Sequence, residues 1–172
     1  MENTVSKQNH LCWFPARVHF GQEIKLKEVL TRMGVESFIP TEPRKNYRGK
    51  VKEHPLIPAL VFIRATKNQA AQLRTVNQLP LNYLFDAAEH RMMVVPDKQM
   101  EDFQRVLDMS VQEGGLVETV VEPGAKVRVT KGPLRGVEGF VIQVTGKCYV
   151  VVSLLDSVFT KAQVPRAYLE MR

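Results

Sequence analysis

Residues 56–64 have the sequence LIPALVFIR, a near-continuous apolar run that ends in one arginine. A short run of this kind is typical of a strand that is buried on both faces in the middle of a sheet. We therefore predict a central strand here. Because neighbouring side chains of a strand point to opposite faces, one face of this segment can pack in a core while the other contacts a partner.

The segments before this run alternate between strand and helix patterns. Residues 11–20 are apolar and aromatic and end at Gly21, which predicts an opening strand. Residues 22–33 predict a helix, because four apolar residues fall on one helical stripe: Leu26, Val29, Leu30 and Met33. Gly34 stands where a helix C-terminus is expected, and residues 35–40 predict a second strand.

A basic segment separates this second strand from the central one. Five cations lie within nine positions: Arg44, Lys45, Arg48, Lys50 and Lys52. The centre of the segment, residues 46–49, has the turn-like sequence NYRG. Such a turn between short flanks predicts a protruding hairpin or loop that is strongly cationic.

The segments after the central run complete an α+β pattern. Residues 68–76 have helical character, and residues 83–85 and 92–95 predict short strands. Pro96 followed by Asp97 is a helix-start signal, so residues 97–109 predict a helix. The resulting order of elements predicts an α/β sandwich with helices against a mostly antiparallel sheet, over residues 11–109.

The remainder of the chain predicts a separate β domain. Gly114 and Gly115 with polar neighbours indicate a flexible linker at residues 110–119. Short strand patterns follow at residues 126–130, 137–145, 148–155 and 159–164, with turn signals between them. This spacing predicts a small all-β barrel of about five strands over residues 120–172.

Composition and charge exclude several functional classes. The 172 residues carry a net charge of +6, which permits a polyanionic partner without requiring one. The two cysteines, Cys12 and Cys148, are expected to be buried free thiols. Apolar runs are far shorter than the roughly 20 residues of a membrane helix, and the N-terminus has no apolar targeting segment. We therefore expect a cytoplasmic protein that does not bind a membrane.

The sequence gives no sign of a catalytic or cofactor site. The four histidines have no metal-ligand spacing: His10, His19, His54 and His90. The glycine-rich stretch KGPLRGVEG at residues 131–139 fits no phosphate-loop pattern, so turns of a β-barrel explain it better. We predict that the protein is not an enzyme and needs no metal or other cofactor.

Two sets of motifs resemble the NusG family of transcription factors. The first set is Trp13-Phe14 in the opening strand, the strand end FIP at residues 38–40, the basic segment and the apolar run with its central Pro58. The second set, EPGAKVRV at residues 122–129 followed by GPL at 132–134 and GFV at 139–141, resembles a KOW motif. Its key residues are Lys126, Arg128, Gly132 and Gly139. The resemblance covers residues 11–172 and implies a polymerase-binding N-terminal domain and an SH3-like KOW barrel.

This resemblance implies that the N-terminal domain binds the clamp region of RNA polymerase and suppresses pausing. The expected contacts are apolar and lie on the opening strand and the apolar run: Trp13, Phe14, Ile57, Pro58 and Leu60. In the family this run contains a Phe-Pro-x-Tyr element, and its aromatic residues are replaced here by the aliphatic residues Ile57 and Leu60. The KOW barrel is expected to recruit a ribosomal protein or a termination factor, with Phe159 at the partner site. Nothing in the sequence requires an oligomer, so we expect a monomer.

Specialised paralogues of the RfaH type also read the non-template DNA strand, which gives a second set of expected contacts. They are His19, Gln22, Lys25 and Arg32 near the first helix, and Arg74, Asn77 and Gln78 after the second. A solvated helix face explains the first group equally well, and a nascent RNA leader is an alternative ligand. Val29 and Met33 stand where the paralogues carry polar residues, so we expect different or weaker sequence reading.

The segments 34–40 and 94–103 resemble UpxY-type antiterminators, which act on capsular polysaccharide operons. We therefore predict an antiterminator of a specific long operon, with a stable β-barrel rather than a helical C-terminal region, because β-branched residues dominate its strands. Two alternatives stay open. One is a general NusG-type factor that couples polymerase to termination or translation. The other is a KOW-type protein that binds ribosomes or RNA.

Overall fold

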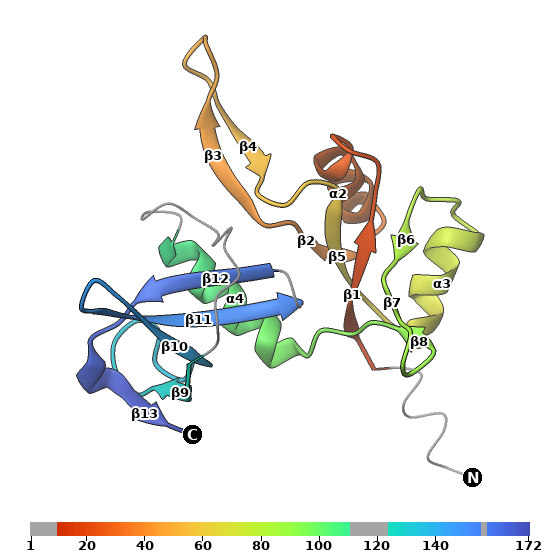
Figure 1. Ribbon diagram of the computed structural model, residues 1–172. Helices are drawn as coiled ribbons and strands as arrows, with labels where there is room; N and C mark the ends of the chain where they lie inside the picture. Colours follow the sequence, from red (N-terminus) through yellow and green to blue (C-terminus); the bar gives the residue numbers. More distant parts are fainter. Residues whose placement is uncertain (1–9, 111–123, 156–157) are drawn as a thin grey trace. The chain divides into compact units, whose positions relative to one another are not determined.

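The computed structural model describes residues 10–110, 124–155 and 158–172, and the chain forms two compact units that divide between Asp97 and Lys98 (Figure 1). The first unit has helices and an antiparallel sheet. The described residues of the second form a β-sheet, one α-helix and one short 3-10 helix. The predicted α+β class is therefore confirmed.

The first unit is built on a four-stranded antiparallel sheet in the order β2-β5-β1-β6. Strand β1 (Cys12–Arg17) pairs along its whole length with β5 (Leu60–Ala65). The outer strands are β2 (Glu36–Phe38) and β6 (Asn82–Tyr83). Strand β5 thus lies inside the sheet, as its apolar sequence predicts.

Strand β5 starts later than the sequence predicts. Residues 56–59 form a turn instead of the beginning of the strand. Pro58 has no N–H to donate to a neighbouring strand, and Ala59 has a φ of 58°, which breaks the extended backbone. The apolar composition of the run therefore predicted its strand but did not reveal the turn in front of it.

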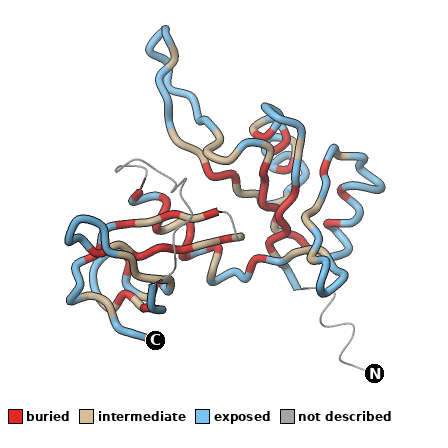
Figure 2. The backbone as a smooth tube through the Cα atoms, in the orientation of Figure 1, coloured by how far each residue is buried: buried red, intermediate tan, exposed pale blue. Residues whose placement is uncertain are grey.

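Helices α2 (Glu23–Arg32) and α3 (Lys67–Thr75) cover one face of this sheet. Leu26 and Leu30 of α2 share a core with Ala70 and Leu73 of α3 and with alternate residues of β1 and β5, such as Phe14, Ala16, Val61 and Ile63. Helix α3 begins with a capping box, in which the Thr66 side chain accepts a hydrogen bond from the Gln69 N–H and the Gln69 side chain accepts one from the Thr66 N–H. In Figure 2 the buried positions of this unit concentrate along the strands of the sheet.

Two short antiparallel pairs complete the first unit. Strands β3 (Thr41–Lys45) and β4 (Val51–Pro55) form the predicted hairpin, which is exposed along most of its length (Figure 2). Strands β7 (Phe85–Asp86) and β8 (Arg91–Met92) form the second pair.

The second unit contains a five-stranded antiparallel sheet in the order β12-β11-β10-β9-β13. Four strands match predicted segments: β9 (Lys126–Val129), β10 (Glu138–Val144), β11 (Lys147–Leu155) and β12 (Val158–Gln163). The sequence did not reveal the short 3-10 helix η2 (Arg166–Tyr168) or β13 (Leu169–Met171), which pairs with β9. Apart from η2, the described residues from 124 onward form strands and their connections and no α-helix, as predicted.

Helix α4 (Asp97–Ser110) groups with the second unit, whereas the sequence suggested a place in the first domain. Its polar residues bind backbone atoms of the β unit: Gln99 Nε2 donates to the Ser153 carbonyl at 2.6 Å, and Arg105 donates to the Pro133 and Arg135 carbonyls. The buried hydroxyls of Ser110 and Thr160 lie 3.0 Å apart. Of the expected linker, residues 111–119 lie outside the described residues.

The structure also bears on the cysteines, on membrane spanning and on metal binding. Both cysteines are free thiols, with Cys148 buried and Cys12 only partly buried. Across the described ranges, no helix is long and apolar enough to cross a membrane. Within the same ranges, no three His, Cys, Asp or Glu side chains gather where they could hold a metal ion.

Candidate protein and nucleic-acid interface

Three exposed segments of the first unit meet at one end of its sheet. Strand β1 ends at Arg17 opposite Leu60, the first residue of β5, so the loop after β1 and the turn before β5 are neighbours. The Val18 N–H donates to the Ala59 carbonyl at 3.1 Å and joins the two. The β3–β4 hairpin starts at the same end, where the Leu56 N–H donates to the Pro40 carbonyl.

A buried carboxylate holds the turn at residues 56–59. Glu23, in the first turn of α2, is only 2% exposed, and its Oε1 accepts a hydrogen bond from the Ala59 N–H at 2.6 Å. Arg17 Nη1 also donates to the Pro58 carbonyl at 3.4 Å. An acidic residue in a first helical turn is common, so the sequence offered no signal of this second role. The contact fixes the turn that presents Ile57 and Pro58.

Ala59 adopts a left-handed conformation that costs an L-residue about 1–2 kcal/mol. We expect Ala59→Gly to stabilise the first unit by about 0.5–1 kcal/mol, because glycine adopts this conformation without strain. The gain is smaller than the strain itself, since glycine loses more conformational entropy on folding than alanine does. The measurement is urea unfolding followed by the fluorescence of Trp13, the single tryptophan. Ala71→Gly, on the exposed side of α3, is the matched control and should cost about 1 kcal/mol. Equal losses in both variants would contradict the strain at Ala59.

The five residues expected to bind polymerase separate into surface and interior positions. Pro58 is exposed and Ile57 is half-buried. Phe14 belongs to the core, where its ring contacts Tyr83 edge-on at 6.1 Å between centroids. Trp13 and Leu60 alternate with the core-facing residues of β1 and β5, and both are also buried. Only the turn at residues 56–59 thus brings predicted apolar contacts to the surface.

The first group of expected DNA contacts is exposed on and before α2. His19 and Gln22 lie in the loop that leads into the helix, and Lys25 and Arg32 lie two turns apart on it. Seven residues of helical spacing place these two cations on one face. Phe20, which was not among the predicted contacts, is 80% exposed in the same loop. This surface combines cations, an amide and an aromatic ring, which suits contact with a nucleic acid strand.

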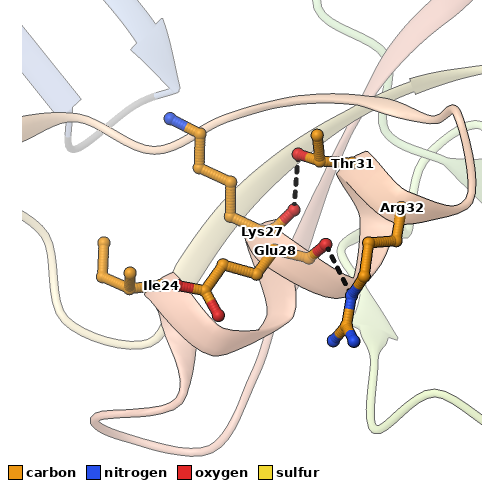
Figure 3. Close-up of a pocket in the computed structure, with 5 residues that line it drawn as sticks. All are labelled: Ile24, Lys27, Glu28, Thr31 and Arg32. Atoms are coloured by element: carbon orange, nitrogen blue, oxygen red, sulfur yellow. Dashed lines mark hydrogen bonds between the residues drawn. The ribbon is translucent and has the colours of Figure 1, made fainter.

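A shallow depression of about 550 Å³ runs along the adjacent face of α2 (Figure 3). Its lining residues are Ile24, Lys27, Glu28, Thr31 and Arg32. The Thr31 hydroxyl donates to the Lys27 carbonyl at 2.8 Å, and Arg32 Nε donates to the Glu28 carbonyl at 3.4 Å. Arg32 thus lines the depression and also shares a helix face with Lys25.

The second group of expected DNA contacts lies at and beyond the end of α3. Arg74, Asn77 and Gln78 are all exposed, and Gln78 has a φ of 52°. Helices α2 and α3 pack on the same face of the sheet through the shared core. Both predicted groups are therefore carried by the helical layer, on segments that are far apart in sequence.

Ionisable groups around the sheet have structural partners. Burial raises the pKa of Tyr83 to about 12, and its hydroxyl donates to the Ala70 carbonyl at 2.8 Å. Hydrogen bonds to Glu36 and Asp97 raise the pKa of Arg64, which stays cationic between them. Burial, with a contribution from Asp97, raises the pKa of the Cys12 thiol, so the unreactive thiol form is favoured.

The residues predicted to form a KOW motif have different structural roles in the second unit. Lys126 is exposed, whereas Arg128 pairs with Glu138 across β9 and β10 and lowers the pKa of that carboxyl. Gly132 lies in a turn with a φ of 81°, and Gly139 lies where β10 closely approaches β11. Phe159, the expected partner contact, is half-buried in β12 opposite Ser153.

Comparison with known proteins identifies a matching protein family. Residues 11–104 match the family model NusG, described as "Transcription termination factor nusG". A solved structure described as "Crystal Structure of MjSpt4:Spt5 complex conformation A" shows 10% sequence identity, covers 93% of this chain and 97% of that chain, and gives a TM-score of 0.29. A comparison with curated proteins gives no match. The family match covers more than half of the chain and includes α2, α3 and the turn at residues 56–59.

Proposed function

Because the chain belongs to the NusG family of transcription factors, we propose that it is an elongation factor that binds RNA polymerase through its first unit. The family match over residues 11–104 is the observation that carries this proposal. The turn at residues 56–59 is the proposed apolar contact with the clamp region, since Ile57 and Pro58 reach the surface there. Such a role requires a cytoplasmic protein and no catalytic group.

The exposed cations of the helical layer support a second contact, with the non-template DNA strand or the nascent RNA. Lys25 and Arg32 lie on one face of α2, and Arg74 is exposed at the end of α3. Phosphate contacts of this kind orient a protein on nucleic acid without reading its sequence. The second unit, as a KOW-type β domain, is proposed to recruit a ribosomal protein or a termination factor.

We further propose that the factor is a specialised antiterminator of the RfaH or UpxY type, acting on one long operon such as a capsular polysaccharide locus. The support is the similarity of residues 34–40 and 94–103 to UpxY-type sequences. An in vitro transcription template with an intrinsic terminator separates this role from a terminating one. An antiterminator raises readthrough in the presence of the factor, whereas lower readthrough would contradict the proposal.

Co-purification of the tagged protein with RNA polymerase tests the central proposal. We expect wild type to retain polymerase and Ile57→Asp with Pro58→Asp to retain at most a tenth as much, because two charges are placed in an apolar contact. Phe85→Asp is the matched control, since Phe85 is 61% exposed in the same unit but outside the turn. Failure of wild type to bring down polymerase would overturn the proposed function. Equal losses in control and turn variants would relocate the contact.

A further inference from the structure

We propose that the β3–β4 hairpin is a binding site for unpaired nucleotides of a nucleic acid strand. In this site Tyr47 stacks on a base, and the surrounding cations hold phosphates. The hairpin lies outside the α2 and α3 surfaces discussed above. The inference depends on the hairpin's own charge and geometry and does not require polymerase binding.

The hairpin concentrates the positive charge of the chain. Between Thr41 and Pro55 there are five cations and two carboxylates, a net charge of +3 out of +6 for all 172 residues. One carboxylate, Glu42, pairs with Arg44. Lys45, Arg48, Lys50 and Lys52 are exposed. A polyanion is the partner that complements such a surface.

The register places these cations on both faces of the hairpin. Arg44 lies directly opposite Lys52 on one face, while Lys45 lies opposite Val51 on the other. Like charges in directly opposed positions destabilise a pair of strands. The exposed strands have little apolar burial to offset this repulsion. The ion pair between Glu42 and Arg44 offsets part of it, and a bound polyanion would offset the rest.

The tip of the hairpin holds an aromatic ring in a defined position. Asn46 Oδ1 accepts hydrogen bonds from the Arg48 and Lys50 N–H groups, both at 2.9 Å, and Gly49 adopts a φ of 74° that closes the turn. Tyr47 is 89% exposed, and the Arg48 guanidinium lies 5.1 Å from its ring centroid. Because the turn is already ordered, a ligand that stacks on Tyr47 pays little additional conformational entropy.

Stacking decides which form of nucleic acid fits. Aromatic side chains bind bases through their faces, and in a duplex those faces are covered by neighbouring bases. The Tyr47 ring therefore requires unpaired nucleotides, as in single-stranded DNA or RNA. Cations on both faces of the ribbon can then follow the phosphates of a strand that crosses the tip.

The test is fluorescence anisotropy of the purified full chain with three labelled oligonucleotides: a single-stranded DNA, an RNA of the same sequence and the corresponding DNA duplex. We expect both single strands, or one of them, to bind at least fivefold more tightly than the duplex. Tyr47→Ala should weaken single-strand binding about tenfold, and Tyr47→Phe should retain it, because stacking contributes on the order of a tenfold effect per base. Phe85→Ala, which removes another exposed ring, should leave binding unchanged.

Charge variants complete the test. Lys50→Gln with Lys52→Gln should weaken binding and reduce the slope of log affinity against log salt by about 1.4, or 0.7 for each phosphate contact. Lys67→Gln with Lys147→Gln has the same net charge but should keep the slope. Duplex binding as tight as single-strand binding, an unaffected Tyr47→Ala variant, or equal slopes in both double variants would overturn the proposal. Because polymerase is absent from the assay, these outcomes are independent of the proposed function.

Discussion

Replacing Gly139 by alanine is expected to lower the free energy of unfolding of the second unit by about 3 kcal/mol. A Cβ at this position would lie 2.3 Å from the Val151 carbonyl oxygen and 3.3 Å from a methyl group of Val150. Both atoms belong to β11, the strand that pairs with β10, so the two strands must separate to admit a methyl group. Overpacking of this kind costs about 1–3 kcal/mol, and a rigid backbone neighbour places the cost at the upper end.

Hydrogen exchange of the amides in β10 and β11 measures this loss where it occurs. Trp13 fluorescence, which reports on the first unit, should keep its unfolding midpoint. Gly146→Asn is the matched control in the turn between the same strands, because its φ of 76° suits asparagine and no atom lies within 4 Å of the added Cβ. Protection that falls equally in both variants would show that the close approach at Gly139 is not the cause.

Asp102→Ala is expected to destabilise the contact between α4 and the β unit by about 2–3 kcal/mol. The carboxylate is 2% exposed and accepts a hydrogen bond from the Glu138 N–H at 3.0 Å, while its other oxygen pairs with Lys98. Lys98 also donates to the Gly136 carbonyl at 2.9 Å. Loss of the carboxylate leaves the part-buried Glu138 N–H without its acceptor and Lys98 without its ion-pair partner. An unsatisfied group costs about 1–3 kcal/mol, more where a charge is involved.

The comparison variant is Asp108→Ala, which removes the same charge from the exposed side of the same helix. Exchange of the Glu138 amide should accelerate about 30-fold or more in Asp102→Ala, as 2 kcal/mol corresponds to that factor, and change little in Asp108→Ala. Similar exchange rates in the two variants would contradict the role of Asp102. A positive result would mean that α4 stays with the β unit although residues 97–104 fall within the matched family region.

Local sequence patterns predicted most of the helices and strands, because apolar periodicity, helix-start residues and turn residues involve only neighbouring positions. The helical stripe through Leu26 and Leu30 and the proline before Asp97 identified helices whose ends agree with α2 and α4 within a few residues. The alternation and turn signals after residue 124 identified four of the five strands of the second unit. Strand β13 was not predicted, because three residues are too few to show an alternating pattern and the strand depends on its pairing with β9.

The expected interface was only partly visible in the sequence. Exposure of His19, Lys25, Arg32 and the hairpin cations follows from their polar or charged side chains, and the structure places them at the surface. The apolar residues Trp13 and Leu60 could equally be core or contact, and their burial depends on which strands neighbour them. Glu23 and Tyr47 were not among the predicted contacts. An acidic residue in a first helical turn and a tyrosine in a turn are both common in proteins, so neither residue indicated a contact.

The fold class, the order of elements, the cationic hairpin and the resemblance to the NusG family could all be inferred from local sequence, because periodicity, turn residues and charge act over a few neighbouring positions. Three other features depend on tertiary contacts. Helix α4 belongs to the β unit through Asp102, Gln99 and Arg105. The turn at residues 56–59 is shaped by buried Glu23, and glycine is required at position 139. Each of these features arises between residues at least 11 positions apart, where burial and close backbone approach depend on segments that meet only in the folded chain.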